Sequence, residues 1–481
     1  MTVLGLDLGT SGVKALLIGE DQRILGQATA PLAVSRPYDG WSEQDPADWI
    51  AASSAAIQTL SQSHGLSDVR ALGLSGQMHG ATLLDRFGAV IRPAMLWNDT
   101  RAASEAAAQD DTPAFRLHTG NIVFPGFTAP KLAWVQAHEP RAFEQVATVL
   151  LPKDYLRFWL TGERISDMSD AAGTAWLDVA ARDWSDELLG LCGLDRTQMP
   201  ALVEGSAVGG TLRAEIAGKL GLPAGIPVAG GAGDNAATAC GLGAIGAGAF
   251  ASLGTSGVLF ASTPTYRPNA ASAVHTFCHA VPKTWHQMGV ILAAADSLNW
   301  LARLTNQEAA ALTADLNEVR APGRALFLPY LSGERTPHND AAIRGQLLGV
   351  ALDDGPEEVT RAVLEGVAFA FRDCLGAMAA AGTTLDAVTA AGGGARSGYW
   401  LDVLATVLGL PVQVPAAGDY GAAFGAARLG LCTLTGADPT EICTPPATER
   451  THTPLAALKP AFDAQYARYR DAYPRLRGLM P

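Results

Sequence analysis

The chain has 481 residues, of which 34 are basic and 47 acidic, and a formal net charge of -13. This length predicts two or more domains, and the acidic balance argues against nucleic-acid binding, which needs clustered Lys and Arg. Apolar runs end well before the ~20 residues of a membrane span. The start lacks the features of a signal peptide, and six scattered Cys without a CxxC pair indicate a reducing compartment. We therefore expect a cytoplasmic protein.

Three short strands are predicted at the start of the chain. LGLDLG, VKALLIG and ILGQATAP are apolar segments separated by Gly/Thr/Ser and Asp/Gln turns. A helix is predicted to follow Asp45, an N-cap residue with Pro46 at the first helical position. Residues 69–85 then predict a buried strand, a tight glycine-bounded turn and another strand. This order differs from a P-loop or dinucleotide-binding start.

The second half predicts a similar series of elements. GAFASLGTSGVLFAST indicates strand, turn and strand, and residues 284–304 indicate a strand that enters a helix. Residues 357–382 predict a long helix with one buried apolar face. Residues 387–409 predict a strand, a glycine turn and a helix, and residues 418–430 predict a helix of small residues that allow close backbone approach.

Two motifs recur in the same order in the two halves. LGTSG occurs at Leu8–Gly12 and again at Leu253–Gly257, and a Gly-Asp pair that opens a small-residue helix occurs at Gly233 and at Gly418. Gly and Ala are common in this chain, so each match alone has little weight. Together they predict a duplicated domain whose first copy carries an insertion within 98–200.

The segment DLGTSGVK has the residue types of a phosphate-binding turn. Its glycines let the backbone approach a ligand, and neighbouring N–H groups with the hydroxyls of Thr10 and Ser11 form a concave donor set, to which Lys14 adds a positive charge. Asp7 ends a buried strand, where a carboxylate is unfavourable without a cation such as Mg2+. The alternative is a hairpin with a glycine turn and a capping Asp.

Asp234 stands at the start of a predicted helix in GGAGDNAATA. Asp is among the best N-cap residues, so a structural cap is one interpretation. The other is a general base that accepts a proton from a substrate hydroxyl. Asp419, its counterpart in the second half, fits the cap better. The second LGTSG follows Ser252 rather than an acid, as expected if one nucleotide lies between two related domains and only one domain supplies a metal ligand.

Three further clusters of residues are candidate ligand or metal sites. Met78 and His79 lie on a tight turn in GQMHG, and Trp97 belongs to LWNDTRA, a group able to stack on and hydrogen-bond a polyol or to start a helix with a salt bridge. HTFCH contains His275, Cys278 and His279. Strand alternation sends Cys278 to the opposite face from the two histidines, so a zinc site is not expected.

These motifs resemble the FGGY family of carbohydrate kinases, and the resemblance covers essentially the whole chain. One family signature is present as GQLLGVALDDGPEEVTRAVLE (345–365) and the other as GFTAPKLAWVQAH (126–138), which has Ala137 where a polar residue is usual. The resemblance implies an α/β fold of two actin-like, ribonuclease H-like domains with ATP in the cleft between them.

The family organisation implies a sugar-binding first domain over 1–245 that holds the catalytic base, and a nucleotide-binding second domain over 246–481. A hinge is expected near 244–248, where GAIGAGA links the halves. The last helix is expected to be able to pack back on the first domain, which would make the domain boundary discontinuous.

The segments SGQMHG, LWNDTRA, GAGDNAA and LSGERTPHND are most similar to family members that phosphorylate xylulose. That resemblance implies that Asp234 is the catalytic base and that Asp7 is the acid near the Mg2+. Asp7 would bind the ion either directly or through a water molecule. The expected sugar contacts are Met78, His79, Trp97, Asp234 and Asn235. The expected nucleotide contacts are Thr10, Ser11, Lys14, Gly254, Thr255, Asn299, Gly393 and Gly394.

The implied reaction transfers the γ-phosphoryl group of ATP to the 5-hydroxyl of D-xylulose. Positioning and electrostatics carry most of such a reaction, with Asp234 as proton acceptor. The expected partners are the sugar and ATP, with a homodimer as a further possibility. The alternatives are a kinase of the same fold for ribulose, fuculose, glycerol or gluconate, a non-catalytic actin-like ATP-binding regulator, or a filament former.

Overall fold

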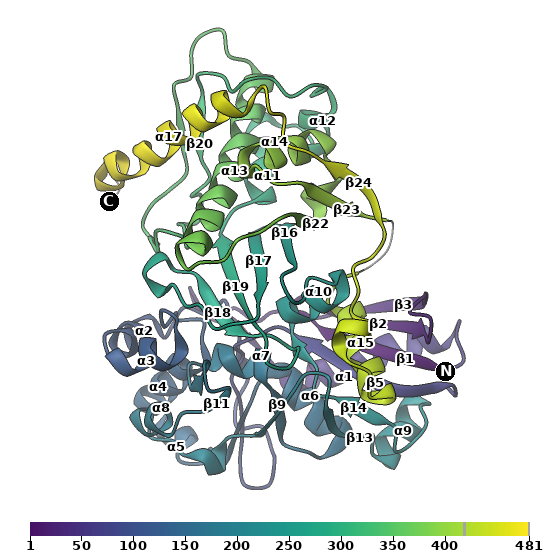
Figure 1. Cartoon of the computed structure of the whole chain (residues 1–481). Helices are drawn as coiled ribbons and strands as arrows, with labels where there is room; N and C mark the ends of the chain where they lie inside the picture. The colour runs from purple at the N-terminus through teal and green to yellow at the C-terminus, as the bar shows by residue number, and fades with distance from the viewer. Residues whose placement is uncertain (417–419, 480–481) are drawn as a thin grey trace.

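Two α/β lobes stacked one above the other make up the protein (Figure 1). The computed structural model describes residues 1–416 and 420–479, so the predicted repeat pair Gly418 and Asp419 lies outside the described residues. Each lobe is built on a seven-stranded mixed sheet. We call the part built on the N-terminal sheet the first lobe and the other part the second lobe. None of the helices in the described ranges is long and apolar enough to cross a membrane.

The sheet of the first lobe has the strand order β13-β14-β5-β1-β2-β3, with β15 beside β5. The N-terminal strands form an antiparallel meander, and β5 runs parallel to β1. The strands are β1 (Thr2–Leu8), β2 (Gly12–Gly19), β3 (Ile24–Pro31), β5 (Val69–Gly76), β13 (Val208–Thr211), β14 (Pro227–Ala229) and β15 (Ala232–Gly233). The three predicted opening strands are thereby confirmed.

The second sheet repeats this arrangement, with the order β18-β19-β17-β16-β22-β23-β24. A meander of β19, β17 and β16 is extended by the parallel strands β22 and β23, as β3, β2 and β1 are by β5 and β14. The strands are β16 (Ala249–Leu253), β17 (Gly257–Thr263), β18 (His275–Cys278), β19 (Trp285–Ile291), β22 (Val388–Ala391), β23 (Val412–Pro415) and β24 (Thr448–His452). The two LGTSG segments connect β1 to β2 and β16 to β17, so the repeat in the sequence is a repeat of topology.

Helices cover both sheets. In the first lobe they are α1 (Pro46–Ser61), α6 (Pro152–Thr161), α9 (Ala214–Leu220), α10 (Asp234–Leu242), α15 (Ala422–Thr435) and α16 (Pro439–Ile442); in the second lobe they are α11 (Ala295–Thr305), α12 (Ala309–Ala314), α13 (Pro356–Ala380), α14 (Gly398–Leu408) and α17 (Lys459–Leu476). The Asp45 side chain accepts from Ala47 N–H at 2.9 Å, which confirms the predicted cap of α1. Val363, Val367 and Ala370 lie on the buried face of α13, as its spacing predicts.

Short helices fill most of the region where an insertion was expected. They are α2 (Ala103–Asp110), α3 (Pro113–Thr119), α4 (Thr128–His138), α5 (Pro140–Phe143), α7 (Met168–Ala171) and α8 (Asp186–Leu191). Their apolar core includes Phe115 and Trp176 and continues into Phe250 and Phe260 of the second sheet. In this region α6 packs on β5 and β13 of the main sheet, and α7 contacts β15 at its edge. The insertion therefore joins the lobes through a shared core.

In the residues that the structure describes, five pairs of short strands lie outside the two main sheets. They are β4 (Glu43–Gln44) with β7 (Ala94–Met95), β6 (Thr82–Leu84) with β8 (Thr148–Leu150), β9 (Ile165–Asp167) with β12 (Ala201–Val203), β10 (Leu177–Asp178) with β11 (Asp183–Trp184), and β20 (Leu326–Leu328) with β21 (Gln346–Leu348).

The chain returns to the first lobe through α15, beside β1 and β5 (Figure 1). Small residues allow this contact: a Cβ on Gly73 of β5 would overlap the Ala426 carbonyl, and one on Gly425 would overlap the Ala237 carbonyl. The C-terminal helix α17 packs on α13, α14 and β20 instead. The expectation that the last helix packs on the first domain is therefore wrong, because its apolar residues belong to the core of the second lobe.

Candidate active site

The carboxyl ends of three neighbouring strands gather the predicted catalytic residues. In the register of the first sheet, Gly76 at the end of β5 pairs with Leu8 of β1 on one side and with Gly233 of β15 on the other. Asp7 precedes the first of these partners, and Asp234 follows the second. Parallel strands bring their carboxyl ends to one edge, where ligands of open α/β sheets bind. The two acids thus flank the turn that carries Met78 and His79.

A cavity of about 310 Å³ opens at this edge, between the lobes. All five residues expected to contact a sugar line it: Met78, His79, Trp97, Asp234 and Asn235. Its opposite wall comes from the second lobe and includes Thr255, His275, Phe277 and Arg335. We call this space the sugar-side cavity.

Asp234 is the first residue of α10, and the residue at the N-cap position is Gly233. Its Oδ1 accepts two hydrogen bonds from Asn235, from the backbone N–H at 2.7 Å and from Nδ2 at 3.0 Å. An ordinary cap accepts from an N–H two or three residues further on. Burial raises the pKa of Asp234, and the two bonds from Asn235 oppose that rise. The group is a carboxylate aimed at a cavity rather than a plain cap.

His79 adopts a left-handed backbone conformation, with φ of +68°. Its Nδ1 lies 2.7 Å from the Gly173 carbonyl, which can only accept, so Nδ1 carries the proton. Burial lowers the pKa of His79 to about 3, and the neutral ring therefore keeps Nε2 as an acceptor. Lys131, from the N-terminal family signature, holds this turn by donating to the carbonyls of His79 at 2.8 Å and Gly126 at 2.7 Å.

A second cavity of about 670 Å³ lies in the second lobe and adjoins the first. Gly254 and Thr255 of the second LGTSG line both spaces. The other predicted nucleotide contacts, Asn299, Gly393 and Gly394, line the larger one, together with the apolar side chains of Leu298 and Trp400. We call it the nucleotide-side cavity. Five of the predicted nucleotide contacts therefore lie around one space, and the predicted sugar contacts lie around the other.

The residues predicted around the first LGTSG line neither cavity. Thr10 Oγ1 donates to Gln77 Oε1 at 2.9 Å and accepts from Trp97 Nε1 at 3.0 Å, which ties the loop to the rim of the sugar-side cavity. Ser11 is exposed, and Lys14 faces Asp7 across the β1–β2 ladder. The Asp7 carboxylate and the Thr10 hydroxyl are oxygen donors of the kind Mg2+ takes, so this edge fits the ion.

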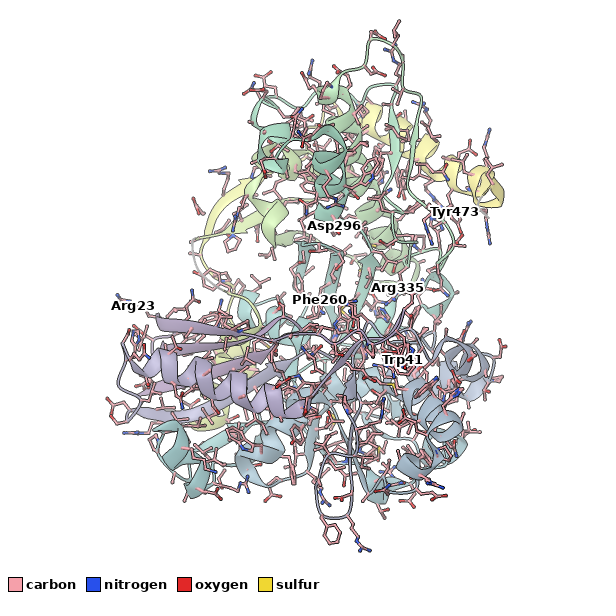
Figure 2. All side chains as sticks on the ribbon, turned by 180° about the vertical axis from the view of Figure 1, so that it is seen from behind. Arg23, Trp41, Phe260, Asp296, Arg335 and Tyr473 are labelled. Atoms are coloured by element: carbon pink, nitrogen blue, oxygen red, sulfur yellow. The ribbon has the colours of Figure 1, made fainter. Side chains whose placement is uncertain are left out.

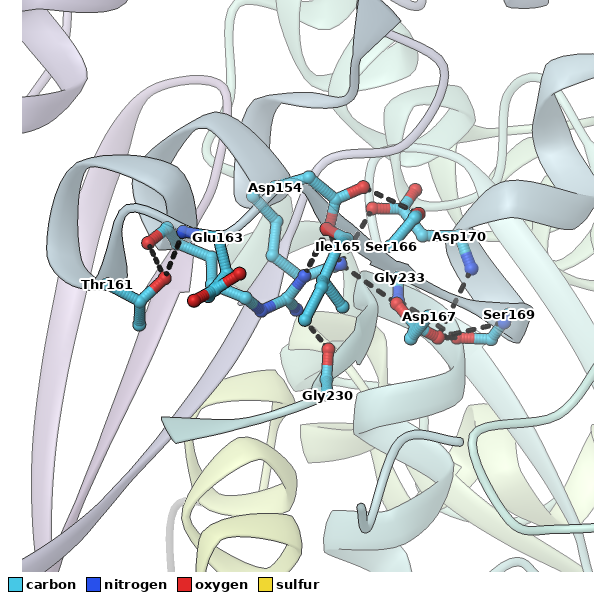
Figure 3. A network of polar contacts seen from close by, with 12 residues as sticks. Asp154, Thr161, Glu163, Ile165, Ser166, Asp167, Ser169, Asp170, Gly230 and Gly233 are labelled. Carbon is cyan, nitrogen blue, oxygen red and sulfur yellow. Dashed lines mark hydrogen bonds and ion pairs between the residues drawn. The ribbon is translucent and has the colours of Figure 1, made fainter. Parts of the chain in front are cut away.

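A buried ionic network lies beside Gly233, the residue that precedes Asp234 (Figure 3). Lys153 pairs with Asp154, Asp167 and Asp170, and Arg157 pairs with Asp154 at 2.9 Å. The three carboxylates are close enough to share a metal ion, but the two cations already occupy the network, and burial raises the pKa of Asp170 well above its ordinary value. We interpret the group as structural.

The network reaches β15, the strand before Asp234, through one hydroxyl. Ser169 Oγ donates to Asp167 Oδ2 and accepts from the Gly233 N–H at 3.1 Å. Since Gly233 immediately precedes Asp234, this bond fixes the backbone from which the candidate base projects.

Sequence reasoning missed the wall that the second lobe contributes. His275 was considered only as a zinc ligand, and Arg335 only as part of the motif LSGERTPHND. In the structure His275 stacks on Phe277, with ring centroids 5.4 Å apart, and both line the sugar-side cavity with Arg335. The motif was the available signal, but nothing in it indicates which side chain faces the ligand.

The repeated α/β lobes and the adjoining cavities fit a transferase that phosphorylates sugars, and comparison with known proteins shows this class. The FGGY family of carbohydrate kinases matches over both of its domains, the N-terminal one at residues 2–241 and the C-terminal one at 249–434. The chain belongs to this family and is a sugar kinase.

Named relatives are similar over nearly the whole chain. The chain is 48% identical to the xylulose kinase of Escherichia coli (strain K12) and 49% identical to that of Klebsiella pneumoniae, each alignment covering 99% of both proteins. A crystal structure described as a xyloylose kinase from Brucella ovis is 59% identical, with a TM-score of 0.98 over 100% of both chains. The xylulose kinase from Rhodospirillum rubrum is 31% identical, with a TM-score of 0.92 over 100% of this chain and 99% of that one.

Proposed function

We propose that the chain transfers the γ-phosphoryl group of ATP to the 5-hydroxyl of D-xylulose, giving xylulose 5-phosphate and ADP. The activity named for the relatives above supports this substrate. The observation that carries the proposal is the pair of adjoining cavities. The five expected sugar contacts line one, five expected nucleotide contacts line the other, and Gly254 and Thr255 belong to both.

Asp234 is the proposed general base. Its carboxylate accepts the proton of the 5-hydroxyl as that oxygen attacks the γ-phosphorus, a contribution of roughly 10²–10⁴-fold in such reactions. Asn235 holds Oδ1 through two hydrogen bonds, which leaves Oδ2 to face the hydroxyl. The neutral His79 offers Nε2 as an acceptor for another sugar hydroxyl and so helps to orient the chain of the sugar.

The two LGTSG loops are proposed to grip the phosphates from opposite lobes. Thr10, Ser11 and Lys14 act from the first lobe, while Gly254 and Thr255 act from the second. Asp7 would hold Mg2+, directly or through water, and the ion would offset negative charge on the transferring group. Asn299, Gly393 and Gly394 are proposed contacts of the nucleoside.

Domain closure is proposed to complete the site and to exclude water, which suppresses ATP hydrolysis. The proposed domains are 1–245 and 246–481, except that α15 of the second half packs on the first lobe, and the proposed hinge is 244–248. Gly243 and Gly246 have φ of +66° and +68°, a conformation that favours glycine in this segment. We further propose that the enzyme acts in the cytoplasm, where thiols stay reduced; its six cysteines are free and buried.

A coupled assay of ADP formation tests the function. The purified protein is assayed with D-xylulose, D-ribulose, L-fuculose, glycerol and D-gluconate, and the position of the phosphate is read by phosphorus NMR. We expect D-xylulose to give the highest kcat/KM and a 5-phosphate product. A higher kcat/KM with another compound would refute the substrate, and ATP binding without any sugar-stimulated turnover would indicate a regulator.

A further inference from the structure

Arg335 lies on the segment between β20 and β21, in a motif to which the proposed mechanism gives no role. It lines the sugar-side cavity opposite His79 and Asp234. Figure 2 shows it at the level where the two lobes meet. The residue is therefore a second-lobe group that reaches a cavity whose proposed catalytic base belongs to the first lobe.

Two aromatic groups hold the guanidinium in place. Its central carbon lies 4.3 Å from the centre of the Phe124 ring, which belongs to the first lobe. Nη1 lies 3.3 Å from Nε2 of His275, and because a guanidinium can only donate, the imidazole nitrogen accepts. Burial and the nearby Arg335 hold the pKa of His275 well below its ordinary value, which agrees with a neutral ring.

No carboxylate of residues 1–416 and 420–479 forms an ion pair with Arg335. The neighbouring Glu334 accepts the backbone N–H groups of Arg335 at 2.8 Å and Leu292 at 3.2 Å. Burial raises the pKa of Glu334 to about 8 and lowers that of Arg335 to about 10, so at neutral pH the guanidinium is charged and the carboxyl is mostly protonated. A buried cation without a counter-charge is costly unless an electron-rich ligand meets it.

Arg335 belongs to the part of the lining that the two cavities do not share. Gly254 and Thr255, which join this space to the nucleotide-side cavity, mark the transfer end, and Arg335 does not line the nucleotide-side cavity. Its charge lowers the pKa of His79 and His275, while burial and the hydrogen bonds from Asn235 set the pKa of Asp234. A pentulose with its 5-hydroxyl at Asp234 would extend its ketone end along the cavity lined by Arg335.

We propose that Arg335 binds the C2 carbonyl of the sugar and makes the site selective for a ketose over the corresponding polyols. This rests on the proposed function. The guanidinium offers donors only, and a ketone oxygen only accepts, so the two are complementary. The hydroxyl of a C2 alcohol also carries a proton, which needs a hydrogen-bond acceptor. The nearby acceptor, His275 Nε2, already accepts from Arg335. A site whose buried donors are paired by one substrate discriminates against an analogue that cannot pair them as well.

The test compares substrates in Arg335→Gln. D-xylulose is set against xylitol and D-arabitol, the two alcohols that differ from it by reduction at C2, measured as substrates and, through Ki, as competitors. Loss of a hydrogen bond from a charged group predicts a drop of about 10- to 100-fold in kcat/KM for D-xylulose. We expect the polyols to change by less than about threefold, since the Gln amide both donates and accepts. Arg335→Lys, which keeps the charge, should fall between.

Arg470→Gln, an exposed arginine on α17, is the matched control and should leave every constant unchanged. Melting temperatures of all variants report folding separately. An equal loss for ketose and polyols, or no loss for D-xylulose, would overturn the proposal, because either outcome removes the selectivity assigned to Arg335. Failure of the wild-type protein to use D-xylulose would instead refute the proposed function, and the comparison would then be repeated with the ketose it prefers and its polyols.

Discussion

At the scale of single residues, the chemistry depends on how the environment of one carboxylate differs from that of its neighbours. Asp154, Asp167 and Asp170 are fully buried and are engaged by Lys153. Asp234 instead lines a cavity, with both of its hydrogen bonds from one residue and on one oxygen. Burial favours its protonated form, and the bonds favour its charged form. A carboxylate held between these effects is suited to accept a proton and release it.

Replacing Asp234 by Asn should remove this base while keeping the shape of the side chain. We expect kcat to fall by about 10²–10⁴-fold, with the Kd for ATP and for the sugar changed by less than about threefold in calorimetric titrations. Asp438→Asn is the matched control: it changes an exposed Asp that caps α16, and Asn caps a helix equally well. Retention of more than about a tenth of kcat would contradict the role of a general base.

The pH dependence of the reaction should report the same group. Only the deprotonated carboxylate accepts a proton, and burial raises its pKa, so kcat/KM should fall on the acid side at a pH above the ordinary value of 3.8. The Asn235 side chain lowers this pKa, so Asn235→Ala should move the acid limb to higher pH. Asn299→Ala, in the nucleotide-side cavity, should not move it. If the acid limb of the kcat/KM profile stays at the wild-type pH in Asn235→Ala, that limb reports the titration of a group other than Asp234.

At the scale of elements, the site depends on strand ends that a helix of small residues holds together. α15 lies against β1, β5 and α10 at once, and Gly5, Gly73 and Gly425 leave the space for its backbone. The helix thus connects β1, which carries Asp7, and β5, which leads into the turn with Met78, to the helix that carries Asp234. Because protein interiors are close-packed, a shift of this helix would displace Asp7, Met78 and Asp234 together.

Gly73→Ala should disturb this contact directly. The added methyl would overlap the Ala426 carbonyl, a backbone atom that cannot rotate away, so we expect a loss of about 3 kcal/mol or more of unfolding free energy. The measurement is urea unfolding followed by circular dichroism. Gly65→Ala is the control, since a Cβ there meets nothing within 4 Å, and its midpoint should not fall. Equal midpoints for the two variants would mean that α15 adapts without cost.

Local signals and long-range packing account for what the sequence could and could not predict. The glycine turn between β1 and β2, the Asp45 cap and the buried stripe of α13 are set by residues close in the chain, and all three were predicted. The wall containing His275 and Arg335 was not, because it forms only when an edge strand and a loop of one lobe meet the other lobe. The error about α17 has the same cause: the helix shows an apolar face, but its sequence does not indicate which part of the molecule covers that face.

At the scale of the whole molecule, the lobes are joined by more than the segment 244–248. The side chains of the second sheet alternate, so that Ala251 and Leu259 pack under the second-lobe helices while Phe250 and Phe260 enter the core of the insertion. The edge strand β18 is also bonded to the first lobe. A large apolar interface restrains relative motion of domains, so closure must leave this part of the contact intact.

The side chain of Asn121 should restrain relative motion of the two lobes. Its Nδ2 donates to the Thr276 carbonyl at 2.9 Å and its Oδ1 accepts from the Thr276 N–H at 2.8 Å, so one side chain of the first lobe satisfies both backbone groups of a residue in β18. Asn121→Ala would leave both groups buried without these partners, at about 1–3 kcal/mol each. We expect a lower melting temperature and a calorimetric transition that separates into two, because the lobes lose part of their coupling.

The same variant should also weaken sugar binding. β18 carries His275 and Phe277 into the sugar-side cavity, so its release should raise KM for the sugar more than KM for ATP, whose proposed cavity lies on the far side of Gly254 and Thr255. Asn317→Ala, an exposed position bonded only within its own turn, controls for the substitution itself. A single transition at the wild-type temperature, with both KM values unchanged, would show that the shared apolar core couples the lobes without Asn121.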